Sequence, residues 1–168
     1  MVEVTITYLE MDARPSYPRP HQPIGSAAAL LHAEKPPTWW FLDLYRAVGV
    51  QYQWTDRFDD SEEELRAFVQ DPDIALYTLI RHGWPAGFFM LDQRKKGVCD
   101  LAYLGLVPEM VGKGYGKFLL QEAIHTGWDG EGVEKMTVNT CTLDHPRALA
   151  LYQSAGFAPV RQVHETHD

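Results

Sequence analysis

The sequence predicts a single mixed α/β domain, and three observations support this fold class. Segments in which β-branched residues alternate with polar ones, such as VEVTITYL at residues 2–9, indicate strands. Segments with apolar residues three and four positions apart, such as the one around Leu120, Ile124 and Trp128, indicate helices. A chain of 168 residues that is 45% hydrophobic can bury one core, so we expect residues 1–168 to form one domain.

After the first strand, the N-terminal half of the chain is predicted to contain a proline-rich loop and two helices. Prolines at 15, 18, 20 and 23 exclude a helix or an inner strand there and predict an extended surface loop. Residues 27–32 are predicted to form a short helix or turn. Residues 38–50, with Thr38 as N-cap, and residues 61–70, capped by Asp60 or Ser61, are predicted to be helices.

The C-terminal half is predicted to form a strand meander followed by two strand–helix units. A turn near Gly83 joins the two strands of a hairpin, and the helix with Leu120 and Ile124 places His125 on its opposite, solvated face. Because few residues follow 165, a seventh strand is expected to be missing or very short, with a partner chain covering the sheet edge. The predicted strands of this half are 74–83, 85–94, 98–107, 134–143 and 158–165.

A glycine-rich turn separates the strand at 98–107 from the helix that follows it. Glycines at 112, 114 and 116 let a ligand approach the bare backbone, and the start of a helix offers free N–H groups to a phosphate. The turn is not a P-loop, because Phe118 follows Lys117. It is not the dinucleotide fingerprint either, because GKGYG at residues 112–116 has the pattern G-x-G-x-G rather than G-x-G-x-x-G. Glu131 and Glu134 also match the acidic residue of that fingerprint only loosely. The alternative is that the glycines serve packing at the start of the helix.

A second motif, DHPRALALYQSAGF, occupies residues 144–157. Pro146 stands where a first helical residue would be, Asp144 and His145 are capping candidates, and Gly156 is a natural stop. Together the two motifs resemble those of the GCN5-related N-acetyltransferases (GNATs), which use acetyl-CoA. The resemblance covers about residues 75–157 and implies a mostly antiparallel sheet of six or seven strands, splayed between strands 4 and 5, with about four helices.

The resemblance also implies which residues bind the coenzyme. The glycine turn would bind its pyrophosphate, and the second helix would flank the pantetheine arm. Val111 stands where the family has Gln or Arg, and His145 stands where it has Asn, so one side-chain contact is lost and another changes its chemistry. The implied coenzyme-binding residues are Leu106, Val107, Val111, Gly112, Lys113, Gly114, Tyr115, Gly116, Lys117, Asn139, His145, Ala148 and Tyr152.

The catalytic residues implied by the resemblance are Tyr152 and a base on the fourth strand. Tyr152 would act as general acid or hydrogen-bond donor to the sulfur, and the N–H groups around Leu106 and Val107 would polarise the thioester carbonyl. Asp100 is the first choice of base, with a solvent-facing carboxylate as the alternative, and His82 and Asn139 have less support. Cys141 is interpreted as a packing residue, because no Cys–His–Asp constellation accompanies it.

Composition narrows the classes of partner. A formal charge of −8 with no long basic run argues against nucleic acid and mildly favours a cationic substrate. Two cysteines and the lack of a signal or membrane-spanning pattern predict a cytoplasmic protein. The spacing of the seven histidines indicates no metal site. A homodimer is the default expectation for a soluble enzyme of this size.

The sequence therefore predicts an N-acetyltransferase that transfers acetyl directly from acetyl-CoA to a primary amine of a small molecule or peptide. The alternatives are a non-catalytic acyl-CoA-binding module, or an acyltransferase with a different acyl group or acceptor. The loop at 11–25 is expected to cover the substrate side. Most aromatic residues of the early helices are expected to pack in the core, with one or two lining the acceptor pocket. They are Trp39, Trp40, Phe41, Tyr45, Tyr52 and Trp54.

Overall fold

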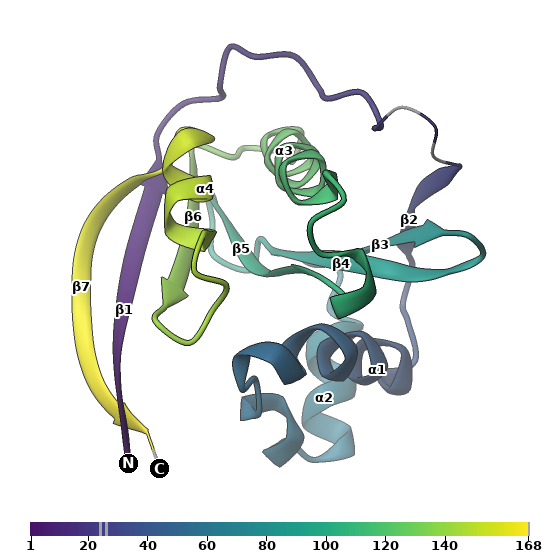
Figure 1. Ribbon diagram of the computed structural model, residues 1–168, viewed down its shortest axis with the longest axis vertical. Coiled ribbons are helices and arrows are strands. Elements are labelled where there is room, and N and C mark those ends of the chain that lie inside the picture. The colour runs from purple at the N-terminus through teal and green to yellow at the C-terminus, as the bar shows by residue number, and fades with distance from the viewer. Residues whose placement is uncertain (24, 26, 168) are drawn as a thin grey trace.

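The structure is a computed structural model that describes residues 1–23, 25 and 27–167 (Figure 1). It contains a sheet of seven strands with four α-helices and three short 3₁₀ helices. The strands are β1 (Val2–Met11), β2 (Ala28–Ala33), β3 (Ile74–Arg81), β4 (Trp84–Asp92), β5 (Val98–Leu106), β6 (Lys135–Cys141) and β7 (Ala158–His167). The helices are α1 (Thr38–Gly49), η1 (Val50–Tyr52), η2 (Asp56–Asp59), α2 (Glu62–Val69), η3 (Pro108–Met110), α3 (Tyr115–Trp128) and α4 (Ala148–Ser154).

The sheet has the order β2-β3-β4-β5-β6-β1-β7, and every neighbouring pair is antiparallel except β5 and β6. The parallel pair is short, since its register runs only from Val98–Lys135 to Asp100–Thr137. Beyond that point the two strands diverge. The predicted mostly antiparallel sheet, splayed between these two strands, is confirmed.

One predicted element is wrong, at one edge of the sheet. Residues 28–33 form strand β2 rather than a helix or turn, because they pair with β3 from Ala28–Arg81 to Ala33–Leu76. At the other edge, β7 is the last strand predicted from the sequence, and no strand follows it among the described residues. The N-terminal strand β1 lies between β6 and β7 and pairs with both, so β1 and β2 bring the sheet to seven strands.

The sheet is covered by helices on both faces, with α1 and α2 on one side and α3 on the other (Figure 1). Strand β4 therefore has a continuous run of buried residues, including Phe88, Phe89 and Met90, rather than an alternating pattern. Phe41 of α1 packs edge-on against Phe88 from one side, and Leu120 of α3 is buried on the other. Among the described residues, no helix is long and apolar enough to cross a bilayer.

The predicted helix caps are only partly correct. Ser61 caps α2, since its side-chain oxygen accepts the Glu64 N–H at 3.1 Å. Thr38 is the first residue of α1 rather than its cap, and its hydroxyl donates to the Glu62 carboxylate at 2.9 Å. That bond links the first turns of the two helices.

The proline-rich segment, described over residues 12–23, leaves the end of β1 and passes over the outside of α3 (Figure 1). Its two arginines form ion pairs with the acidic side chains of α3 and its C-terminal end. Arg14 contacts Asp129 at 2.7 Å, and Arg19 contacts Glu122 at 2.6 Å and Asp129 at 2.7 Å. The segment thus lies on the face opposite α1 and α2, and none of its described residues lines the cavity described below. This argues against the prediction that it covers the substrate side.

His125 is buried beneath this segment, with 4% of its surface exposed, and is not solvated as predicted. Its Nδ1 lies 3.2 Å from a guanidinium nitrogen of Arg14, and the Tyr17 ring packs edge-on against it. The helical pattern placed His125 correctly on the outer face of α3. That face is covered by Arg14 and Tyr17, which lie more than a hundred positions earlier in the chain.

Candidate active site

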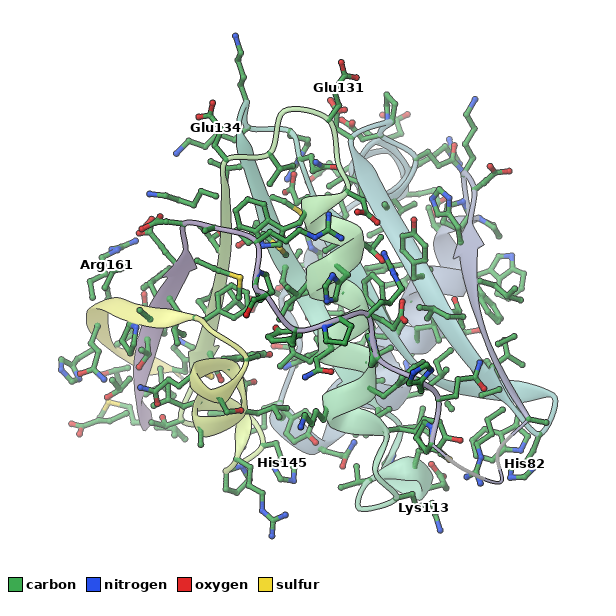
Figure 2. The ribbon with its side chains drawn as sticks, turned by 90° about the horizontal axis from the view of Figure 1, so that it is seen from above. His82, Lys113, Glu131, Glu134, His145 and Arg161 are labelled. Carbon is green, nitrogen blue, oxygen red and sulfur yellow. The ribbon has the colours of Figure 1, made fainter. Side chains whose placement is uncertain are left out.

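A cavity of about 530 Å³ opens where β5 and β6 separate. Its walls come from β5, the glycine turn with the start of α3, the β6–α4 connection with α4, and the segment between α1 and α2. Figure 2 shows Lys113 of the glycine turn and His145 near one end of α3, and Glu131 and Glu134 at its other end. The two sequence motifs therefore meet at one site. The two glutamates lie away from the site, which excludes the dinucleotide fingerprint.

The glycines of the turn border open space rather than packed atoms. Gly112 and Gly114 have φ angles of +82° and +87°, which favour glycine. A Cβ added at Gly112, Gly114 or Gly116 would meet no atom within 4 Å, whereas one at Gly87 or Gly127 would lie 2.5 Å from a neighbour. The turn glycines thus leave room for a ligand, and this observation argues against the packing alternative.

The start of α3 fits an anionic group in that space. Gly114 is its N-cap and supplies no side-chain oxygen, so the first N–H groups of the helix are not capped by a side chain. The helix has 14 residues, and its dipole places partial positive charge at this end. Lys117 and Val111 line the cavity beside it, whereas Lys113 does not.

Of the two amides predicted to polarise a carbonyl, only one is available. The Val107 N–H donates to the Ala86 carbonyl oxygen at 3.0 Å within the sheet, so its predicted role is wrong. Successive amides of a strand point to opposite sides, and the Leu106 N–H therefore points away from β4. The Leu106 N–H thus points into the gap between β5 and β6, where the two strands are no longer paired, and Leu106 lines the cavity.

Tyr152 extends from α4 toward the cavity that it lines, with 8% of its surface exposed. Burial raises the pKa of its phenol well above the usual range, and the nearby Asp144 charge adds to this. None of the described residues accepts a hydrogen bond from its hydroxyl, which is therefore available to a ligand. A phenol held in this way stays protonated and donates.

His145, Asn139 and Ala148 also line the cavity, as predicted for coenzyme-binding positions. The Arg147 N–H donates to His145 Nδ1 at 3.1 Å, so Nε2 of the neutral ring carries the proton. His145 can therefore donate a hydrogen bond in place of the family's Asn. The helix α4 begins at Ala148 rather than at Pro146, the predicted first helical residue.

The structure does not bring Asp100, Tyr115 or His82 to this cavity. Asp100 lies where β5 and β6 are still paired, and its carboxylate accepts the Thr137 hydroxyl hydrogen at 2.6 Å. The Tyr115 side chain is buried beneath the start of α3. His82 lies in the β3–β4 turn, well away from His145 (Figure 2). A shift of one residue in the strand register moves every side chain of a strand to the other face of the sheet, and the sequence does not reveal that register.

Asp100→Asn should leave turnover unchanged and stability at pH 7 equal or higher. Burial raises the pKa of Asp100, so its charged form is disfavoured in the folded protein. That cost is present above the folded-state pKa and is relieved as pH falls through it. Asparagine removes the charge and keeps an oxygen for Thr137. Urea unfolding between about pH 4 and pH 8 should show that the variant's gain in free energy of unfolding over the wild type becomes smaller as the pH falls. A tenfold loss of turnover in the folded variant would instead reinstate Asp100 as a base.

Sequence reasoning missed several residues that shape the other end of the cavity. Trp54 Nε1 donates to Asp144 Oδ1 at 3.3 Å, joining the α1–α2 connection to the β6–α4 connection. Asp144 also accepts from the Thr140 hydroxyl at 2.7 Å and the Cys141 N–H at 3.0 Å. The dense aromatic composition near Trp54 was the available signal. Tyr45, Tyr52 and Trp54 all line the cavity, whereas most of this group was expected only in the core.

Cys141 lines the cavity as well, and burial raises the pKa of its thiol. A nucleophilic cysteine needs a lowered thiol pKa. This supports its interpretation as a packing residue. Among the described residues, no group of three His, Cys, Asp or Glu side chains could hold a metal ion.

Comparison with known proteins identifies the class that this fold and site define. Residues 38–157, more than half of the chain, match the Acetyltransferase (GNAT) family. The protein therefore belongs to the GNAT family of acetyltransferases. A comparison with curated proteins finds no significant match.

Solved structures share the fold at low sequence identity. A GCN5-related N-acetyltransferase from Kribbella flavida has a TM-score of 0.65 and 17% identity over 95% of this chain and 56% of that one. One from Sphaerobacter thermophilus has a TM-score of 0.69 and 17% identity over 95% and 49%, so this chain spans about half of each. A spermidine N-acetyltransferase from Vibrio cholerae, in complex with CoA and spermine, has a TM-score of 0.60 and 17% identity over 78% and 80%. These likenesses show the fold.

Proposed function

We propose that this protein is an acetyl-CoA-dependent N-acetyltransferase that transfers acetyl directly to a primary amine of a small molecule or peptide. The observation that carries the proposal is the continuity of one cavity. It runs from the open glycine turn at the start of α3 to the gap between β5 and β6. A pyrophosphate fits the first part, and a narrow thioester arm with its acceptor fits the second.

In the proposed reaction, bound acetyl-CoA supplies an activated thioester. The amine nitrogen bonds to the acetyl carbon, the carbon–sulfur bond breaks, and one proton moves from nitrogen to sulfur. The Leu106 N–H would donate to the carbonyl oxygen as negative charge develops on it. The first N–H groups of α3 and Lys117 would hold the pyrophosphate, and His145 Nε2–H would donate to the pantetheine arm.

Tyr152 would act as a hydrogen-bond donor to the departing sulfur. A thiol has an ordinary pKa of about 8.5, below that of any phenol whose pKa is raised by burial. Complete proton transfer from Tyr152 to the thiolate is therefore uphill. The phenol stabilises the developing charge while keeping its proton, and the proton that ends on sulfur comes from the amine.

Isothermal titration with acetyl-CoA, together with a thiol-release assay over a panel of amines, tests the proposal. We expect binding at one site per chain and release of free thiol only when a suitable amine is present. Binding without release on amines, alcohols or longer acyl donors would favour the alternative of an acyl-CoA-binding module. Release with an alcohol or a longer acyl-CoA would correct the acceptor or the acyl group. Absence of binding would overturn the proposal.

A further inference from the structure

The cavity is lined by both cations and carboxylates. Lys117 belongs to the first turn of α3, beside the glycine turn, where the proposed coenzyme phosphates would lie. The carboxylates, Asp56 and Asp144, belong to η2 and to the β6–α4 connection, which also carries Arg147. In the proposed function, the wall formed by residues 52–56 and Tyr103 is the acceptor end of the cavity.

Asp56 is the carboxylate that remains free at the acceptor end. Asp144 already accepts three hydrogen bonds, from Trp54, Thr140 and Cys141. Among the described residues, none forms a hydrogen bond or ion pair with the Asp56 side chain. Burial raises the pKa values of Tyr103 and Cys141, on opposite walls of the cavity, and the Asp56 charge adds to both. Its charge therefore acts across the cavity.

Of the described arginines, Arg147 lines the cavity, at the residue before α4. The arginine beside Asp56 in the chain, Arg57, does not line the cavity and is engaged by other residues. Its Nε donates to the Tyr103 hydroxyl at 2.9 Å, a terminal nitrogen donates to Asp60 at 3.2 Å, and its guanidinium lies 3.8 Å from the Phe68 ring centroid. An acceptor that carries its own carboxylate would therefore face Asp56 without compensation.

The wall beside Asp56 is aromatic and fixed in place. Trp54 lies with its ring centroid 5.6 Å from the rings of Tyr45 and Tyr103. It fits directly over Gly49, where a Cβ would come within 2.5 Å of the Trp54 Cβ. Its N–H is held by Asp144. Aromatic faces attract both ammonium groups and apolar bodies.

We propose that the acceptor is a primary amine carried on an aromatic or apolar body without a neighbouring carboxylate, bound by Asp56 against the Trp54 wall. The inference rests on the proposed function, because it concerns the acceptor end of the same cavity. Asp56 attracts the ammonium form of the amine from solvent, and Trp54 with Tyr103 contacts its body. Free α-amino acids are rejected because their carboxylate meets Asp56.

Matched pairs of acceptors test the class of substrate. We would compare 2-phenylethylamine with phenylalanine, which differ by one carboxylate, and 2-phenylethylamine with butylamine, which lacks the ring. We expect kcat/KM to fall about 100-fold on adding the carboxylate and about tenfold on removing the ring. Equal rates for 2-phenylethylamine and phenylalanine would overturn the inference.

Asp56→Asn isolates the charge, and Asp59→Asn on the same 3₁₀ helix is its matched control, since Asp59 does not line the cavity. We expect Asp56→Asn to raise KM for 2-phenylethylamine about tenfold with little change in kcat, and to narrow the gap to phenylalanine. Added salt should raise the wild-type KM but not that of the variant. Identical behaviour of the two variants would contradict the role of Asp56.

Titrating 2-phenylethylamine and phenylalanine into the CoA-saturated and free protein separates this inference from the proposed function. If the wild type bound the amine but not the amino acid, and Asp56→Asn no longer bound the amine, the inference would be supported even if no thiol were released. In that case the proposed catalysis would be wrong while the inference about the acceptor stood. If neither compound bound, in a protein that does bind acetyl-CoA, the inference alone would be overturned.

Discussion

Gly116→Val should abolish high-affinity binding of acetyl-CoA in a protein that remains folded, with a loss of about 100-fold or more. Gly116 lies in the first turn of α3 with an ordinary negative φ, and its added side chain would meet no protein atom within 4 Å. The fold therefore tolerates valine, and stability should equal or slightly exceed that of the wild type. The side chain would instead occupy the space proposed for the pyrophosphate.

A graded series and a remote control make this experiment decisive. Gly116→Ala, →Val and →Leu should lose affinity in step with side-chain size while their unfolding curves stay alike. Thr126→Val, near the other end of α3, should bind acetyl-CoA like the wild type. Gly114 is a less informative position, because its φ of +87° strains any other residue. Unchanged affinity in folded Gly116→Leu would show that the coenzyme lies elsewhere.

Tyr152→Phe should lower kcat about 100-fold while leaving acetyl-CoA affinity and stability nearly unchanged. The change removes only a hydroxyl that bonds to none of the described residues, so the packing of the ring against Phe157 is kept. Because burial raises the Tyr152 pKa, the phenol stays protonated through neutral pH. The ratio of wild-type to variant kcat should therefore stay constant between about pH 6 and pH 9.

Tyr77→Phe is the matched control, since it removes another partly buried phenol that lies outside the cavity, on β3. It should leave kcat unchanged. Thiol release measured across the pH range gives both ratios in one experiment. Equal kcat for Tyr152→Phe and the wild type would make Tyr152 a packing residue of α4. A ratio that falls as pH rises through neutrality would show that the phenol ionises there, contrary to the effect of its burial.

Local patterns in the sequence were enough to predict most of the fold and one half of the site. The glycine turn, the tyrosine helix and the antiparallel meander each depend on residues close together in the chain. Their spacing sets backbone conformation directly, through φ at Gly112 and Gly114 and through the apolar stripe of α3. These motifs supply much of the cavity wall, and the predicted coenzyme-binding residues line the cavity except for Val107, Lys113 and Tyr115.

The acceptor end and the sheet edges were decided by contacts between distant parts of the chain. Strand β2 exists because it meets an open edge of β3, and His125 is buried because Arg14 and Tyr17 lie across it. Asp100 was expected in the cavity, but the β5–β6 register pairs it with Thr137, whose hydroxyl donates a hydrogen bond to its carboxylate. No local propensity encodes such pairings, because each depends on which surfaces meet once the layers have packed. The sequence by itself thus determined the family, most of the strand–helix order and the glycine turn, whereas only the tertiary structure decided which charges and aromatic rings line the cavity.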